Sequence, residues 1–174
     1  ELGPRQSALA MQNVYSFILG IVGLVCSLPF MVVVGCLVKM TSKGPMLYRQ
    51  RRVGMNGRVF TLAKFRSMYV DAEARSGAVW AKKDDPRITP LGRFLRKVRL
   101  DELPQFWNVV KGDMAIVGPR PERPEFVEML AQQIPYYRQR LAVKPGITGW
   151  AQISHKYGDT ELDAMIKLDR KSVV

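Results

Sequence analysis

An uncharged apolar run of 25 residues, from Val14 to Val38, constrains the fold of this 174-residue chain more than any other feature. As a straight α-helix the run would extend roughly 37 Å, which exceeds the hydrocarbon core of a bilayer at about 30 Å. It is too long for the core of a signal peptide and lacks a convincing cleavage site. We therefore predict a membrane segment, followed by enough chain for one globular domain.

Pro29 lies within this run and leaves two geometries open. A proline inside a helix removes one backbone hydrogen bond and kinks the helix, which spanning helices tolerate. Lys39 and Lys43 follow the run, whereas Arg5 is the only cation before it, so positive charge places the C-terminal side in the cytoplasm and fixes the N-terminus only weakly. Both a spanning helix and a re-entrant helix that bends at Pro29 fit these residues.

Charge is spread unevenly along the chain, whose formal net charge is +12. From Leu2 to Val70 there is no Asp or Glu, but there are nine Lys or Arg. Such a gradient suits an anionic membrane leaflet, where each nearby cation contributes on the order of 1 kcal/mol. Nucleic acid would attract the same charge, so charge alone does not choose between them. A single histidine, His155, excludes a multi-histidine metal centre.

We expect three regions along the chain. Residues 1–13 are predicted to be a cloning remnant or linker, because the chain starts without Met; residues 14–38 form the membrane segment; residues 39–174 form a cytoplasmic domain. The abrupt end at Val174 is compatible with a shortened C-terminus.

Two basic elements are predicted in the cytoplasmic part. Residues 46–48 and 59–62 form a hairpin across Asn56-Gly57, either a solvated ribbon or one that presents cations to lipid headgroups or a nucleotide diphosphate. Thr89 and Pro90 start a helix over 91–100 with apolar residues at helical spacing and basic residues elsewhere. That helix either lies in the membrane interface or packs its apolar side on the core.

Candidate chemistry follows this helix. Asp101 and Glu102 are adjacent carboxylates before Pro104; neighbouring helical residues diverge by about 100°, so one could attack while the other binds metal. The alternative is a plain surface acid pair. Arg120 stands between Pro119 and Pro121, and a guanidinium on a stiff backbone suits bidentate phosphate binding. No Gly-rich nucleotide fingerprint occurs in the sequence.

Over roughly residues 14 to 152 these motifs closely resemble, in order, the bacterial sugar transferases of the monotopic polyprenyl-phosphate phosphoglycosyl transferase superfamily. The motifs that carry the resemblance are the apolar segment, Gly44-Pro45, Lys64-Phe65-Arg66-Ser67-Met68, Arg87-Ile88-Thr89, Leu91 to Lys97, Leu100 to Gln105, Lys111 to Met114, Val117 to Pro121 and Lys144 to Gln152.

The resemblance implies an α/β (α+β) monotopic membrane protein on the cytoplasmic face of the inner membrane. Its expected parts are a re-entrant helix hairpin at 14–38 bent at Pro29, interfacial amphipathic helices and a small globular catalytic part. Two departures stand out: Leu28, instead of a serine, precedes Pro29, and the usual tyrosine-rich ending is not recognisable in residues 163–174.

The implied reaction moves a sugar 1-phosphate from a UDP-sugar to polyprenyl (undecaprenyl) phosphate, releases UMP and initiates bacterial surface glycan synthesis. By resemblance, Asp101 would be the nucleophile of a covalent aspartyl-phosphosugar intermediate and Glu102 the Mg²⁺ ligand. Lys64, Arg66, Arg96 and Arg120 would bind substrate phosphate. The implied partners are the two substrates and anionic membrane lipids, without nucleic acid and with an oligomer possible.

Two rival interpretations remain. One is a non-catalytic, membrane-tethered basic module that binds lipid or nucleic acid, and the other is a fragment of a polytopic glycosyltransferase with one spanning helix. Release of UMP from a UDP-sugar in the presence of Mg²⁺ would distinguish a sugar 1-phosphate transferase from both rivals. No residue identifies the sugar.

Overall fold

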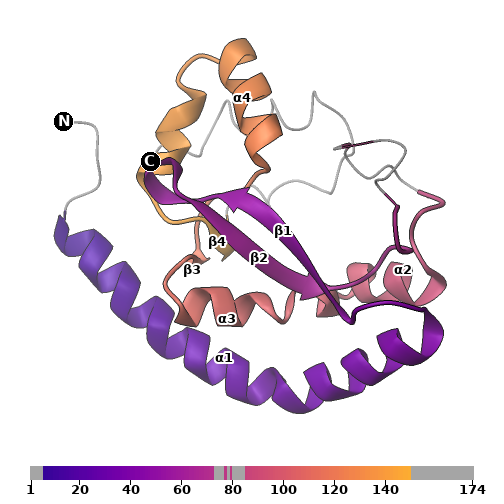
Figure 1. Cartoon of the computed structure of the whole chain (residues 1–174). Coiled ribbons are helices and arrows are strands. Elements are labelled where there is room, and N and C mark those ends of the chain that lie inside the picture. Colours follow the sequence, from indigo (N-terminus) through magenta and orange to yellow (C-terminus); the bar gives the residue numbers. More distant parts are fainter. Residues whose placement is uncertain (1–5, 73–76, 78, 80–84, 150–174) are drawn as a thin grey trace.

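The computed structural model describes residues 6–72, 77, 79 and 85–149 (Figure 1). Helices and strands are mixed, as the α/β (α+β) prediction requires. Part of the predicted N-terminal remnant, residues 1–5, lies outside the described residues. So do residues 150–174, which include Trp150 to Gln152, His155 and the C-terminal ending. The elements, in chain order, are α1 (Gln6–Thr41), β1 (Leu47–Val53), η1 (Met55–Gly57), β2 (Val59–Phe65), α2 (Pro90–Lys97), η2 (Leu100–Glu102), α3 (Gln105–Val110), β3 (Ala115–Val117), α4 (Pro124–Gln133), η3 (Tyr137–Ala142) and β4 (Gly146–Thr148).

The helix hairpin predicted for residues 14–38 is not seen. Residues 6–41 form one helix, α1, which contains Pro29 and bends as it passes beneath the rest of the molecule (Figure 1). It starts at Gln6, inside the segment predicted to be a remnant or linker. A proline removes a single backbone donor, and the bonds on either side keep the helix continuous. The hydroxyl of Ser27 donates to the carbonyl of Leu24 at 3.2 Å, so a serine is available one position earlier than the family pattern places it.

The buried side of α1 combines small residues with two core valines, Val34 and Val38. Ser16, Gly20, Ser27 and Gly35 are buried, and a Cβ added to Gly20 would lie 2.8 Å from Val109 on α3. These residues let α1 approach the globular part closely. The outward side exposes large apolar residues such as Val14, Phe17, Ile18, Val25, Phe30 and Val33. Among the described residues, α1 is the one helix long and apolar enough to cross a bilayer, with a mean hydropathy of 2.7 in its most apolar window.

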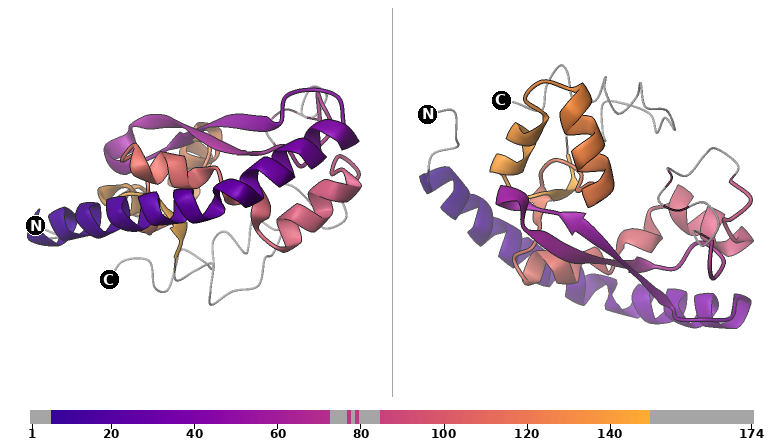
Figure 2. Two further views of the ribbon diagram at one scale, coloured as in Figure 1. Left: turned by 90° about the horizontal axis from the view of Figure 1, so that it is seen from below. Right: turned by 45° about the horizontal axis from the view of Figure 1, so that its top comes forward.

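The predicted hairpin is present as the antiparallel pair β1–β2, with register from Leu47↔Phe65 to Val53↔Val59. Its turn uses left-handed backbone at Asn56 and Gly57. In Figures 1 and 2 the hairpin lies between α4 on one side and α1 with α3 on the other. The side chain of Asn108 on α3 extends the edge of β2, because it accepts from the Ala63 amide and donates to the Thr61 carbonyl. The parallel pair β3–β4 forms a second, smaller sheet.

Helix α2 begins as predicted and ends earlier. Thr89 caps it by accepting a 2.9 Å hydrogen bond from the Gly92 amide, and Pro90 follows. The helix ends at Lys97 because Arg99 adopts a left-handed conformation with φ of 62°. Leu95 is buried in the core while Phe94 is 57% exposed, so α2 combines a core-facing side with an outward apolar side chain.

Candidate active site

The Asp101–Glu102 pair is buried. After the left-handed turn at Arg99, both residues lie in the short 3-10 helix η2, and Pro104 then opens α3. Asp101 is 5% exposed and Glu102 is 9% exposed, so the alternative of a plain surface acid pair is wrong. Buried carboxylates need partners, because an unpaired charge is costly away from water.

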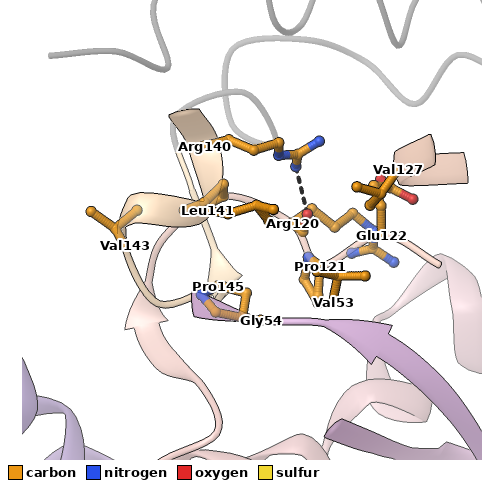
Figure 3. A pocket seen from close by; sticks show the side chains of 11 residues that line it. Val53, Gly54, Arg120, Pro121, Glu122, Val127, Arg140, Leu141, Val143 and Pro145 are labelled. Atoms are coloured by element: carbon orange, nitrogen blue, oxygen red, sulfur yellow. Dashed lines mark hydrogen bonds between the residues drawn. The ribbon is translucent and has the colours of Figure 1, made fainter. Parts of the chain in front are cut away.

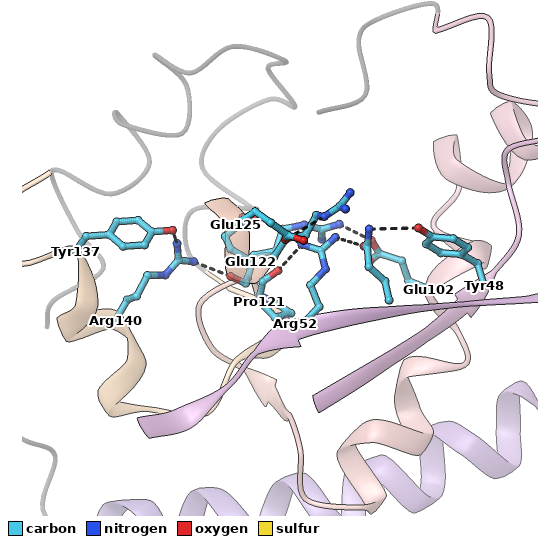
Figure 4. Close-up of polar contacts among 11 residues, drawn as sticks. Tyr48, Arg52, Glu102, Pro121, Glu122, Glu125, Tyr137 and Arg140 are labelled. Atoms are coloured by element: carbon cyan, nitrogen blue, oxygen red, sulfur yellow. Dashed lines mark hydrogen bonds and ion pairs between the residues drawn. The ribbon is translucent and has the colours of Figure 1, made fainter. Parts of the chain in front are cut away.

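Cations from different elements surround the pair. The guanidinium of Arg120, in the loop between β3 and α4, lies 2.9 Å from Glu102 Oε1, and Arg99 lies 3.4 Å from Glu102 Oε2. Lys64 on β2 and Arg96 on α2 both act electrostatically on Asp101. Figure 4 shows Glu102 and Tyr48 at one end of the resulting row of polar contacts, with Arg52 beside them. The structure therefore gathers two acids and several cations that are far apart in the sequence.

The surroundings give the two carboxylates opposite properties. Burial, and then the charge of Glu102, raise the pKa of Asp101 above its ordinary value, although Lys64, Arg96 and Arg120 oppose this. Burial also acts to raise the pKa of Glu102. The charge and hydrogen bond of Arg120 act in the opposite direction, as do the charges of Arg99 and Lys64, and together they lower the pKa. Glu102 is thus held as a carboxylate, and Asp101 is the more basic of the two.

The charged form of Lys64 is disfavoured in this site. Burial, followed by the charges of Arg52, Arg96 and Arg120, lowers its pKa to about 8, although Asp101 partly offsets them. Its ammonium lies 5.4 Å from the centre of the Tyr48 ring. An anion that enters the site would stabilise the charged form of a lysine kept among arginines in this way. Such an arrangement is typical of a binding site for phosphate.

Most of the residues predicted for the site come together. Glu102, Lys64, Arg96 and Arg120 all act electrostatically on Asp101, and Lys64 and Arg120 also act on Glu102.

Arg66 lies elsewhere. It is buried beside the end of α1, where it donates two 2.7 Å hydrogen bonds to Ser42, and its phosphate-binding role stays a prediction. Arg66, directly after β2, therefore ties the chain just beyond α1 to the end of that strand.

Sequence reasoning missed Arg52 as a site residue. Arg52 pairs with Phe60 and Lys64 with Tyr48 in the hairpin register. Positions 48, 52, 60 and 64 share one face of the hairpin, since side chains alternate along a strand. That alternation was the available signal. Arg99 was noted only as a basic residue, because its left-handed turn is not visible in the composition.

A magnesium ion fits the acid pair only together with substrate. The described residues hold no group of three or more His, Cys, Asp or Glu side chains that could form a complete protein cage. Mg²⁺ needs no such cage, because it keeps several waters and is usually bound by one or two carboxylates plus substrate phosphates. Glu102, ionised and beside Asp101, provides that kind of donor.

A small pocket lies behind the Arg120 loop rather than over the carboxylates. It is a shallow hollow that is partly open to solvent. Figure 3 shows Arg120, Pro121 and Glu122 along one side of it and Arg140 with Leu141 along another. Because Asp101 and Glu102 do not line this pocket, we do not take it as the reaction cleft.

Comparison with known proteins places this geometry in a family. The model for bacterial sugar transferases matches residues 7–173. A UDP-N-acetylgalactosamine-undecaprenyl-phosphate N-acetylgalactosaminephosphotransferase of Aeromonas hydrophila is 46% identical over 81% of this chain and 33% of its own length. A UDP-glucose:undecaprenyl-phosphate glucose-1-phosphate transferase of Xanthomonas campestris pv. campestris is 47% identical over 86% of this chain and 31% of its own length.

A shorter relative from Bacillus subtilis is named, provisionally, an undecaprenyl-phosphate N-acetylgalactosaminyl 1-phosphate transferase. It is 50% identical over 76% of this chain and 74% of its own length. The chain thus spans about a third of the Aeromonas and Xanthomonas relatives and most of the Bacillus one. With its family model matched over nearly the whole length, the chain belongs to the bacterial sugar transferase family.

Proposed function

We propose that this chain is the catalytic part of a phosphoglycosyl transferase. It moves a sugar 1-phosphate from a UDP-sugar to polyprenyl phosphate, releases UMP, and works at the cytoplasmic face of the inner membrane. The observation that carries the proposal is the buried Asp101–Glu102 pair enclosed by Lys64, Arg96 and Arg120. The named reactions of the relatives support the same class of transfer.

The two carboxylates have separate roles in this proposal. An oxygen of the Asp101 carboxylate attacks the β-phosphorus of the UDP-sugar, the bond from that phosphorus to UMP breaks, and UMP leaves. An oxygen of polyprenyl phosphate then attacks the same phosphorus, and the Asp101 carboxylate is released. The raised pKa of Asp101 suits a nucleophile, because a more basic carboxylate is the better nucleophile once ionised.

The cations make the attack of an anion on a diphosphate feasible. Arg120 is 37% exposed while it contacts Glu102, so part of its guanidinium can reach a substrate phosphate. Lys64 and Arg96 approach Asp101 from other elements. Fixed cations of this kind stabilise charge that develops on phosphate oxygens. Glu102, with Asp101 nearby, would hold Mg²⁺, which when bound neutralises phosphate charge.

The position of α1 and α2 supports a lipid acceptor. The outward side of α1 is apolar, and Phe94 on α2 and Val98 directly after it are exposed. Because η2 follows α2 after two residues, the reacting carboxylates stand close to a surface suited to the membrane interface. Re-entrant insertion of α1, with both ends in the cytoplasm, is part of the proposal.

The test uses the full chain in detergent or nanodiscs, with Mg²⁺ and one UDP-sugar at a time from a panel. Without polyprenyl phosphate, wild type should release about one UMP per chain and gain the mass of a sugar phosphate on the peptide that contains Asp101. The adduct should be cleaved by hydroxylamine, and Asp101→Asn should fold without forming it. Lys111→Met, a change at an exposed cation, is the matched control. Ternary-complex kinetics without a mass increase would remove Asp101 from the nucleophile's role.

A further inference from the structure

The loop that carries Arg120 is held by its backbone carbonyls. The Pro119 carbonyl accepts from the Gly146 amide at 3.0 Å, and the Arg120 carbonyl accepts from the Arg140 guanidinium at 2.6 Å. The Pro121 carbonyl accepts from Arg52 at 2.9 Å, and the Glu122 carbonyl from the Val53 amide at 2.9 Å. Four successive carbonyls thus have donors from β4, η3 and β1.

Arg140 is itself held in one orientation. Its second guanidinium nitrogen donates to the Tyr137 hydroxyl at 2.6 Å, and the guanidinium lies 5.0 Å from the centre of the Tyr137 ring. Tyr137 is buried in a cluster with Val53, Val127 and Leu130. Figure 4 shows Arg140 and Tyr137 at one end of the row of polar contacts that reaches Glu102 at the other. The donor to the Arg120 carbonyl therefore stands on a fixed part of the core.

The direction of the Arg120 side chain depends on the backbone rotations of the loop. The orientation of the Arg120 carbonyl changes with the same rotations. The rings of Pro119 and Pro121 fix their own φ angles, and Pro121 also restricts the residue before it. The rotations that remain are ψ of Pro119 and, within the extended region, φ and ψ of Arg120, and the orientation of the Arg120 carbonyl reflects them. By holding that oxygen, Arg140 limits the direction in which the Arg120 guanidinium leaves the loop toward Glu102.

We propose that Arg140 is a positioning residue for the transfer reaction, acting through the Arg120 carbonyl to keep the Arg120 guanidinium on Glu102 and on the substrate phosphate. The inference rests on the proposed function for its kinetic part. Arg52 performs the corresponding task on the Pro121 carbonyl, but it also acts on Lys64, so its removal would not isolate the effect. Arg140 is the cleaner probe.

The experiment compares Arg140→Gln with Arg138→Gln in the full chain. Arg138 lies on the same η3 segment, is 65% exposed and pairs with Glu128 at 3.0 Å, so it is a matched control. Arg140→Gln should slow UMP release in the first half-reaction by about 10- to 100-fold, the cost of a small misplacement of a catalytic group. Arg138→Gln should stay within about twofold of wild type.

A comparison of kcat with KM separates positioning from mere loss of fold. Loss of fold lowers the fraction of active enzyme and leaves the KM for the UDP-sugar unchanged, whereas a displaced Arg120 guanidinium should lower kcat and raise this KM in Arg140→Gln and not in Arg138→Gln. Arg140→Lys, which keeps a cationic donor, and Tyr137→Phe should change both parameters in the same direction by less. If Arg140→Gln does not fold, these two variants decide. A slow variant with an unchanged KM would overturn the inference.

A readout independent of catalysis separates this inference from the proposed function. In thermal unfolding, Arg140→Gln and Glu102→Gln should be non-additive, because both act through Arg120, whereas Arg138→Gln and Glu102→Gln should be additive. Non-additivity of Arg140→Gln and Glu102→Gln, without UMP release by wild type, would contradict the proposed function. It would still show that Arg140 positions Arg120 on Glu102. Additivity in both pairs would sink the positioning role whatever the activity.

Discussion

Replacing Lys64 by methionine should raise the stability of the protein and lower its rate of UMP release. Methionine keeps an unbranched chain of similar length and removes the ammonium. Burial and the charges of Arg52, Arg96 and Arg120 oppose that ammonium more than Asp101 favours it, which is why the pKa of Lys64 is lowered to about 8. The substitution removes a charge that the folded site holds at a cost.

The lowered pKa sets the scale of the effect. A fall from the ordinary value of 10.5 to about 8 corresponds to about 3 kcal/mol against the charged form in the folded state. This is an upper bound on the gain in stability, because methionine leaves the stem but loses the contact with the Tyr48 ring. At about 2–4 °C per kcal/mol for a chain of this size, the melting temperature should rise by up to about 12 °C.

The pH dependence gives the sign. Below pH 8, Lys64 is charged in both the folded and the unfolded state, and its full cost is present. Between pH 8 and 10.5 the folded state releases the proton while the unfolded state keeps it, so the stability of wild type rises relative to the variant. The gap between Lys64→Met and wild type should therefore be largest near pH 7 and close as the pH approaches 10.5.

Thermal unfolding at several pH values, together with UMP release, tests this reasoning. Lys111→Met removes an exposed cation paired with Asp113 and should change the melting temperature little at any pH. If Lys64→Met melts below wild type at pH 7, the acids stabilise Lys64 more than the arginines destabilise it. The idea of a cation held ready for a phosphate would then be wrong.

Three further outcomes are expected. Glu102→Gln should keep its fold, because Arg120 and Arg99 retain an oxygen acceptor, but lose at least about nine-tenths of the turnover, or about 1.4 kcal/mol; a rate above a tenth of wild type at saturating Mg²⁺ would mean that another residue holds the ion. Gly92→Ala should lower the free energy of unfolding by about 1–3 kcal/mol, because a Cβ there meets the Ser67 backbone, while Arg93→Ala on the same helix should not; equal melting temperatures would contradict this packing. A cysteine at Ser7 should resist an impermeant reagent applied outside intact cells, whereas labelling would establish a spanning α1.

Several parts of the protein could be predicted from the sequence because they depend on neighbours in the chain. The apolar run of α1, the Thr89–Pro90 start of α2 and the Asn56-Gly57 turn of the hairpin are local patterns with local causes. The two prolines beside Arg120 likewise predicted a stiff loop. The adjacent Asp101 and Glu102 indicated a site, and the resemblance to the family motifs suggested the roles that we propose for them.

Other properties depend on residues brought together from distant parts of the chain. The elements β1, β2 and α2 and the Arg120 loop together decide whether the acid pair is buried and which carboxylate is the more basic. They also decide how far the pKa of Lys64 is lowered. The same motif that contains Lys64 also contains Arg66, yet Lys64 is among the main influences on Asp101, while Arg66 binds Ser42.

The sequence by itself determined the kind of protein: an apolar helix with cations behind it, a capped basic helix, a hairpin, and two acids followed by a proline-flanked arginine. These are consequences of side-chain chemistry and backbone preference within a few residues. Only the tertiary structure decided that α1 is one bent helix, that Arg52 faces the site, and that Arg140 holds the Arg120 carbonyl. Charge and hydrogen bonding act over a few ångströms in space, and that distance is independent of separation along the chain.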